Sequence, residues 1–315
     1  MTKNSEKMNA VTLHSFGAPE VLRYERVPSP VIQSPDEVIV AIKAASVNAA
    51  DRLVRSGRYP GQAPTLPHIL GRDFSGVIIA AGAEADLKPG EEVYGVCLNT
   101  TESAYAEQIA ISSKLVARKP SGLSHVEAAS IALAGLTAMI SLQDTLQLQR
   151  GERIFIQGGA GGVGSMAVQL AKHMGAFVAT TARNVNHEYL AGLRADQTID
   201  YTEQDPAQVL EGFDASFDTV GGERCVAQSF AVLRPNGRAA FIASGITAPV
   251  SPRPDAVSLR PAVGRSRAAM ERISALVDAG ALRAPEIREL PLAEAARAHA
   301  MSEDRHVRGK IVLVP

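Results

Sequence analysis

The chain has 315 residues, of which 46% are hydrophobic and 21% are charged, and its formal net charge is −1. This length suits two domains or one large one, and the composition is that of an ordinary soluble globular protein. A nearly neutral chain gives no electrostatic support for binding nucleic acid or an anionic membrane.

The cysteines and the N-terminal segment bear on the compartment. Cys97 and Cys225 belong to no metal-binding or redox motif, and we interpret them as free, buried thiols that suit a reducing cytosol. Residues 1–7 lack the apolar region of a secretory signal and are expected to form a loose polar tail. No run of 18 apolar residues occurs, so we expect no membrane span and a cytoplasmic protein.

Short β-rich runs separated by turns occupy the first part of the chain. Residues 37–47, 74–82 and 91–96 are rich in β-branched residues, and the second run ends at a glycine. Short strands at this spacing predict a barrel or a sandwich.

From about residue 125 the pattern changes to alternating strands and helices. Strands are predicted at 153–157, 176–182, 197–201, 215–222, 237–245, 256–260 and 309–315. Helices are predicted at 164–175, 187–195 and 266–280. This alternation predicts a mostly parallel sheet that helices cover on both faces.

Five glycines fall within the seven residues 158–164. Gly159, Gly161 and Gly164 fit the pattern G-x-G-x-x-G, directly after a predicted strand and at the start of a predicted helix. The first glycine permits a tight turn, the second lets a pyrophosphate approach the backbone, and the third lets the helix pack on the strand. The helix amides then face the pyrophosphate, so the sequence predicts a dinucleotide site. Its expected contacts are Gly158, Gly159, Ala160, Gly161, Gly162, Val163 and Gly164.

The segment after the second of these strands decides between NAD and NADP. An NAD site usually places an acid there to bind the ribose 2′-hydroxyl. The segment offers Thr181, Arg183 and Asn184 and no acid. Since Arg183 can pair with a 2′-phosphate, the sequence favours NADP(H), with Thr181 and Arg183 as contacts. A solvated Arg183 is the alternative.

The order of motifs along nearly the whole chain resembles the zinc-free, zeta-crystallin-like quinone oxidoreductases of the medium-chain dehydrogenase/reductase superfamily. The motifs are "SVNAADRLVRSGRYPG", "ILGRDFSGVIIAAG", "IALAGLTAM", the glycine turn, "FDTVGG" and "PLAEAARAHAM". The resemblance implies an α/β chain with a GroES-like, β-rich catalytic domain of residues 1–127 and 281–315. It implies a Rossmann domain, a doubly wound parallel sheet, of residues 128–280, and an active site in the cleft between the two domains.

The resemblance also bears on metal binding. Zinc-dependent relatives carry a cysteine three residues before an aspartate, and later a Gly-His-Glu segment. This chain has Asn48 three residues before Asp51, and Arg72 in the place of the histidine. Neither side chain supplies the thiolate or imidazole that zinc needs, so no metal is expected. We interpret the nearby His68 as a packed or surface residue.

Three residues are expected to have catalytic roles. The resemblance places Asn48 near the nicotinamide and the substrate oxygen, where hydrogen bonds would align the reactants; a loop-capping role is the alternative. Asp51 is expected to fix the loop rather than to transfer protons. Leu53 replaces a tyrosine that is common in relatives, and Tyr59 is a candidate substitute or a packed residue at the base of the loop.

Further cofactor contacts are implied at strand ends and on one helix. They are Asn48, Thr137, Tyr201, Gly221, Ser244, Gly245, Ser258 and Leu259. Arg260 is interpreted as an anion contact or a salt-bridge partner, and Lys310 as a structural residue or a weak phosphate contact.

We therefore expect an NADPH-dependent, zinc-independent enzyme that transfers hydride to a quinone or to an α,β-unsaturated carbonyl compound. An enoyl-thioester reductase and a non-catalytic NADPH-binding sensor or structural protein are the alternatives. The missing ligands nearly exclude a zinc alcohol dehydrogenase. The resemblance also implies a homodimer formed through edge strands of the Rossmann sheets, with no nucleic-acid or membrane partner.

Overall fold

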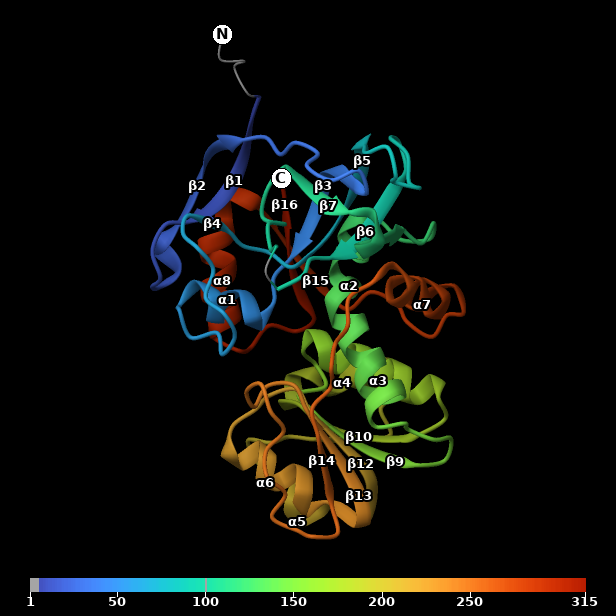
Figure 1. Ribbon diagram of the computed structural model, residues 1–315. Helices are drawn as coiled ribbons and strands as arrows, with labels where there is room; N and C mark the ends of the chain where they lie inside the picture. The colour runs from blue at the N-terminus through green and yellow to red at the C-terminus, as the bar shows by residue number, and fades with distance from the viewer. Residues whose placement is uncertain (1–5, 100) are drawn as a thin grey trace. The chain divides into compact units, whose positions relative to one another are not determined.

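The computed structural model describes residues 6–99 and 101–315 (Figure 1). The chain forms two compact units. The first unit comprises the chain up to Leu133 together with Gly264–Asp278 and Ala284–Pro315, and the second comprises Ala134–Val263 and Ala279–Arg283. These limits differ from the expected ones, because helix α7 (Arg267–Asp278), which we expected in the Rossmann domain, groups with the first unit.

The first unit contains two sheets. In the larger sheet the strand order is β15-β16-β3-β5-β6-β8, and β7 also pairs with β3. Its strands are β3 (Glu37–Ser46), β5 (Asp73–Ala81), β6 (Glu92–Val96), β7 (Gln108–Ser112), β8 (Val116–Arg118), β15 (Ile287–Pro291) and β16 (Lys310–Val314). The smaller sheet has the order β2-β1-β4, with β1 (Lys7–Leu13), β2 (Leu22–Pro28) and β4 (His68–Ile69).

Alternation along β3 explains how the larger sheet forms a core. Val38, Val40 and Ile42 are buried, while the residues between them are partly exposed. This period of two turns one face of the strand inward, onto a core that includes Phe74 and Leu313. Helices α1 (Ala49–Arg55) and α8 (Ala295–Glu303) also belong to this unit.

The loose tail expected at residues 1–7 does not include Lys7. Residues 1–5 lie outside the described part of the chain, and Lys7 already begins β1, in register with Pro28 of β2. Because this segment is polar, the sequence did not reveal that β1 begins there and pairs with β2.

The second unit is a six-stranded parallel sheet with the order β11-β10-β9-β12-β13-β14. Its strands are β9 (Arg153–Gln157), β10 (Phe177–Thr181), β11 (Gln197–Ile199), β12 (Phe213–Asp218), β13 (Leu233–Phe241) and β14 (Val257–Leu259). Its helices include α3 (Gly162–His173), α4 (His187–Gly192), α5 (Pro206–Val209) and α6 (Glu223–Ala231). In Figure 1, α3 and α4 lie on one side of this sheet and α5 and α6 on the other. This is the doubly wound Rossmann order, which confirms the predicted fold class.

Helix α2 (His125–Met139) begins in the first unit and ends in the second, where residues Ile140–Thr145 continue it as a π-helical turn. Although we expected no membrane span, His125–Thr145 is long and apolar enough to cross a membrane, with a mean hydropathy of 1.4. Since 78% of this window is buried inside the protein, as in the core helix of a soluble protein, it is weak evidence for a span.

Candidate active site and cofactor-binding residues

The glycine turn lies at the carboxyl end of β9, in the centre of the parallel sheet. Gly158 has a φ of +74°, which turns the chain, and α3 begins at Gly162. The amide of Gly158 donates to Thr181 Oγ1 at 3.0 Å, and the amide of Gly159 donates to the carbonyl oxygen of Thr181 at 3.1 Å. Thr181 is buried and therefore supports the turn, while its predicted contact with a cofactor stays a prediction.

The glycines of this turn are required for different reasons. A Cβ on Gly159 would lie 2.1 Å from Thr180 Oγ1, and a Cβ on Gly164 would lie 2.1 Å from the carbonyl oxygen of Gly158. Packing alone requires these two glycines, whereas Gly158, rather than Gly159, adopts the left-handed conformation.

Gly161 is different, because its φ is −77° and a Cβ there would meet only the oxygen of Gly158, at 3.4 Å. The protein itself therefore has room for a side chain at this position. A ligand that approaches the backbone closely gives a reason for the glycine, and the turn fits the pyrophosphate of a dinucleotide.

The ends of β12 and β13 carry further predicted contacts. Asp218 Oδ1 accepts the amides of Val220 and Gly221 at 2.8 and 2.9 Å, which folds the chain back at the end of β12. Beyond β13, the Oγ atom of Ser244 is buried and has no hydrogen-bond partner in the described structure, and Gly245 has a φ of +99° with no atom near its Cβ position. An unpartnered buried hydroxyl beside open backbone is a suitable ligand contact.

Two residues on β14 were also predicted to meet the cofactor. Ser258 Oγ donates to the carbonyl oxygen of Pro249 at 2.5 Å, so its side chain holds the proline-rich loop, and Leu259 pairs with Ala240 of β13. Arg260 Nη1 donates to the carbonyl oxygen of Phe241 at 2.6 Å. Arg260 therefore braces the end of β13 within its own unit.

An acid that the sequence analysis passed over lies near the predicted 2′-phosphate residues. Asp200 follows β11, and its two carboxylate oxygens accept from the amide of Asn184 at 2.7 Å and from Thr202 Oγ1 at 2.6 Å. The Thr202 hydroxyl and the nearby amides lower the pKa of Asp200. Asp200 thus orders the segment that carries the exposed Arg183, and Tyr201 beside it is 40% exposed.

Thr137, the predicted cofactor contact on α2, is 8% exposed, and its backbone oxygen accepts from Ser141 Oγ at 2.7 Å. This hydrogen bond from Ser141 to the backbone of Thr137 stabilises the point where α2 continues as the π-helical turn.

In the first unit, Asn48 is the residue that caps α1. Its amide donates to Asp51 Oδ2 at 2.8 Å, so the loop-capping role is present. Its side chain is also held, because Nδ2 donates to Asp73 Oδ1 at 2.7 Å and Oδ1 accepts from Lys310 Nζ at 2.8 Å. These partners come from β5 and β16, far away in the sequence.

Asp51 is fully buried at the centre of a polar cluster. Its Oδ2 accepts from the hydroxyl of Tyr105 at 2.9 Å, and its Oδ1 lies 3.3 Å from Arg72 Nε. Burial raises the pKa of Asp51 to about 7, against the opposing effect of Arg72. These contacts agree with the expected role of Asp51, which is to fix the loop.

Arg72 connects this cluster to Tyr59. Its Nη2 lies 2.6 Å from a carboxylate oxygen of the buried Glu102, which in turn lies 3.8 Å from His68 Nε2. The guanidinium carbon lies 4.6 Å from the centre of the Tyr59 ring, and Nη1 donates to the Tyr59 hydroxyl at 3.4 Å. Leu53, on α1, is partly buried.

The residues of this cluster do not fit a zinc ion. The positions that resemble zinc ligands hold an amide and a buried guanidinium, and neither binds zinc. Within residues 6–99 and 101–315, no three His, Cys, Asp or Glu side chains are grouped so as to hold a metal. Arg72 moreover brings a permanent positive charge to the two carboxylates that would otherwise attract a cation.

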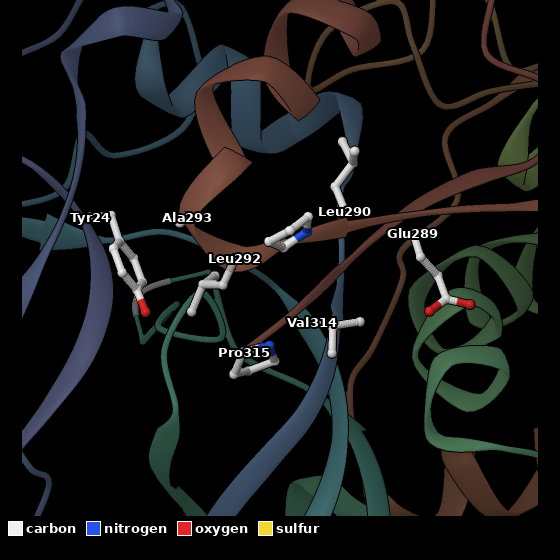
Figure 2. Close-up of a pocket in the computed structure, with 8 residues that line it drawn as sticks. Tyr24, Glu289, Leu290, Leu292, Ala293, Val314 and Pro315 are labelled. Atoms are coloured by element: carbon white, nitrogen blue, oxygen red, sulfur yellow. The ribbon is translucent and has the colours of Figure 1, made fainter.

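A surface hollow of about 430 Å³ lies elsewhere on the first unit (Figure 2). Tyr24 lies on one side of the hollow and Glu289 on the other, and Leu292, Val314 and Pro315 lie between them. None of the predicted site residues lines it, and aliphatic side chains and prolines make up most of its wall. The first unit therefore carries its candidate residues in the polar cluster around Asn48 and Asp51, outside this hollow, and the second unit carries its own at the glycine turn.

Comparisons with known proteins agree with the fold of the two units. The alcohol dehydrogenase GroES-like domain family matches residues 34–128, and the zinc-binding dehydrogenase family matches residues 193–313. An NADPH-dependent alkenal/one oxidoreductase from Arabidopsis thaliana chloroplasts is 30% identical over 98% of this chain and 80% of its own length. A quinone oxidoreductase from Pseudomonas aeruginosa is 32% identical over 96% of this chain and 98% of its own.

A solved structure shows the same likeness over the whole chain. The Escherichia coli quinone oxidoreductase complexed with NADPH is 26% identical and covers 98% of this chain and 100% of its own, with a TM-score of 0.88. Fold, motif order and relatives together show that the chain belongs to the quinone oxidoreductase family of the medium-chain dehydrogenase/reductase superfamily, whose members named above are oxidoreductases.

Proposed function

We propose that this protein is an NADPH-dependent, zinc-independent oxidoreductase that transfers hydride to a quinone or to an α,β-unsaturated carbonyl compound. The observation that carries the proposal is the glycine turn, where the fold leaves room at Gly161 that a bound pyrophosphate would use. Two relatives support it, since the one from Arabidopsis thaliana is an NADPH-dependent alkenal/one oxidoreductase and the one from Escherichia coli is a quinone oxidoreductase solved with NADPH.

The preference for NADPH over NADH rests on the end of β10. No acid follows Thr181 directly, and Arg183 is exposed there. Asp200, the nearby acid, has both oxygens occupied by its own loop, so it offers little to a ribose hydroxyl. A 2′-phosphate would therefore meet a guanidinium group rather than a competing carboxylate.

Some residues bind the cofactor, and others orient the reactants. NADPH, when bound, supplies the hydride from C4 of its nicotinamide. The amides in the first turn of α3 bind the pyrophosphate, because those of Gly158, Gly159 and Gly161 already have partners within the protein. The buried Oγ of Ser244 offers a further polar contact. The Asn48 loop (residues 47–48, between β3 and α1) orients the reactants, because the side chains of Asp51, Asp73 and Lys310 hold it in one conformation.

Charge that develops on the oxygen of the acceptor needs donors nearby. The hydroxyl of Tyr59 accepts a bond from Arg72 and so keeps its own proton for donation to such an oxygen. Arg72 adds a positive charge behind that hydroxyl. We assign the stabilisation of the developing charge to this pair.

The test is a panel of quinones, enones and enoyl thioesters, each assayed by oxidation of NADPH under the same conditions. Turnover with quinones or enones, faster than with thioesters, is the expected result. A clear preference for crotonyl-type thioesters would make the protein an enoyl reductase instead. Tight NADPH binding without turnover of any compound would favour a sensor or structural protein.

We also propose a homodimer formed through an edge of the parallel sheet. β14 is the last strand in the sheet order, and Val257 on it is 49% exposed. An unpaired edge of this kind can pair with a second copy of the chain. Light scattering at micromolar concentration should give twice the chain mass, and a monomer would contradict the proposal.

A further inference from the structure

The side-chain ammonium group of Lys310 is buried at the start of β16, where an unpaired charge is costly. Its Nζ donates to the carbonyl oxygen of Val47 and to Asn48 Oδ1, at 2.8 Å each. The preceding residue, Gly309, has a φ of +69°, and a Cβ there would lie 1.9 Å from the carbonyl oxygen of Glu286. The backbone that presents Lys310 is therefore fixed, and both of these acceptors belong to the Asn48 loop.

The side-chain amide of Asn48 lies between opposite charges. Its Oδ1 faces the ammonium of Lys310, and its Nδ2 faces the buried carboxylate of Asp73 at 2.7 Å. Turning the amide by half a rotation would set Nδ2 against Nζ, two donors, and Oδ1 against a carboxylate, two acceptors. The two charged partners thus fix which way the amide points.

The remaining hydrogen-bonding capacity of Asn48 follows from this orientation. Nδ2 has two hydrogens, and its two acceptors are Asp73 Oδ1 and, at 3.3 Å, the carbonyl oxygen of Ser46. Oδ1 has two lone pairs, and Lys310 uses one of them. The second lone pair lies toward the start of α1, where the capping box also brings the amide of Asp51 to the Asn48 side chain.

Asp73 itself is anchored, so the arrangement is rigid on both sides. It is fully buried and accepts from Ser46 Oγ at 2.8 Å and from the amide of Leu133 at 3.1 Å. A carboxylate held in this way cannot follow Asn48 if the amide moves. The opposing charge of Lys310 then decides how firmly the amide is held.

We propose that Lys310 is a positioning residue: acting on Asn48 from the side opposite Asp73, it holds the amide in one orientation and so fixes the loop that orients the bound reactants. This inference rests on the proposed hydride transfer, in which the Asn48 loop orients the reactants.

The first test is Lys310→Met, which keeps the length of the side chain and removes the ammonium. We expect kcat with a quinone or enone to fall about tenfold to hundredfold, as misplaced orienting groups do. The Kd for NADPH should change little, because the glycine turn belongs to the other unit. Lys119→Met is the matched control, since the Lys119 side chain is also 5% exposed and bonds loop carbonyl oxygens, those of Pro120 and Leu123, but does not reach Asn48.

A double-mutant cycle separates positioning from general damage. If Lys310 acts through Asn48, then Lys310→Met should reduce kcat much less in an Asn48→Ala background than in the wild-type protein. Losses that multiply would overturn the proposal, as would an unchanged kcat in Lys310→Met. Lys310→Gln, which keeps a donor without the charge, takes the place of Lys310→Met if that variant fails to fold.

A second measurement does not depend on turnover. In protein labelled with ¹⁵N-asparagine, the side-chain amide signal of Asn48 is assigned by its loss in Asn48→Ala. Lys310→Met should shift this signal and speed its exchange with water, and Lys119→Met should leave it in place. If the wild-type protein reduces no acceptor, the proposed function fails, but the amide signal of Asn48 still tests the role of Lys310. An unchanged Asn48 signal in Lys310→Met overturns that role.

Discussion

The guanidinium group of Arg72 lies 2.6 Å from the carboxylate of Glu102, and both side chains are almost completely buried. The same guanidinium lies 3.3 Å from Asp51, so one cation serves two buried acids. Each of these charges is costly to bury alone and is tolerated because its partners are present. The Asn48 loop therefore depends on Arg72, through Asp51, for its conformation.

Arg72→Met should destabilise the protein by about 3 to 5 kcal/mol, because it leaves the buried carboxylate of Glu102 without its counter-ion. Urea unfolding measures this loss. Arg118→Met is the control, since Arg118 pairs with Glu91 while its side chain is 68% exposed, and a loss below about 1 kcal/mol is expected for such a pair. Equal losses in the two variants would show that Arg72 contributes no more than a surface ion pair.

Asp51 should make stability depend on pH. Burial raises its pKa in the folded protein to about 7, above the value of about 3.9 in an unfolded chain. Between these values the folded state holds more protons, so the stabilising contribution is complete below pH 4 and is lost as the pH rises through 7. Unfolding free energies of the wild-type protein and Asp51→Asn should diverge over this range, by about 1.4 kcal/mol for each unit of pKa difference. Parallel curves would show that Asp51 is ionised throughout.

The second unit was largely predictable from the sequence, and the reason is physical. Strand β9 is buried on both faces, so its central residues Ile154, Phe155 and Ile156 form an apolar run without alternation. The glycine turn and α3 follow this strand directly. Strand β2 was not predicted, because Arg23, Glu25 and Arg26 lie on an exposed edge and hide its alternation. Helix α1 has only seven residues, too few for a clear helical period.

Some residues of the candidate site could also be predicted from the sequence, and others could not. Asn48 and Asp51 could be selected from a local motif, and the structure joins them through one hydrogen bond. Asp73 and Lys310, which hold the Asn48 side chain, lie 25 and 262 residues away, and only the pairing of β3 with β5 and β16 brings them together. A lysine directly before an apolar strand was the available signal, because a charge at that place must be paired.

Tyr59→Phe should separate packing from chemistry at the same cluster. The ring stays in place over Arg72, while the hydroxyl that accepts from Arg72 Nη1 is lost. We expect unchanged folding and a kcat lowered by about tenfold or more, as when one donor to a developing charge is removed. The measurement is steady-state oxidation of NADPH with the best acceptor of the panel. An unaltered kcat would make Tyr59 a packing residue only.

Arg183→Ala should weaken NADPH binding much more than NADH binding. NADPH differs from NADH by its 2′-phosphate, and the guanidinium of Arg183 can pair with that group. Titration with each cofactor gives the two Kd values, and their ratio is the readout. Arg150→Ala is the control, because Arg150 is also exposed but precedes β9, at the opposite end of the parallel strands. Equal weakening of both cofactors would remove Arg183 from the site.

The glycine turn offers a matched pair of substitutions that distinguishes folding from binding. Gly159→Ala places a Cβ 2.1 Å from Thr180 Oγ1, and this overpacking should cost about 1 to 3 kcal/mol of stability. Gly161→Ala meets only the oxygen of Gly158 at 3.4 Å, with a φ of −77° that alanine adopts readily, so the stability should be nearly unchanged. Its methyl group instead occupies the space of the pyrophosphate, and NADPH affinity should fall at least about tenfold. Thermal unfolding and NADPH titration of both variants check this, and a Gly161→Ala protein that binds NADPH normally would place the pyrophosphate elsewhere.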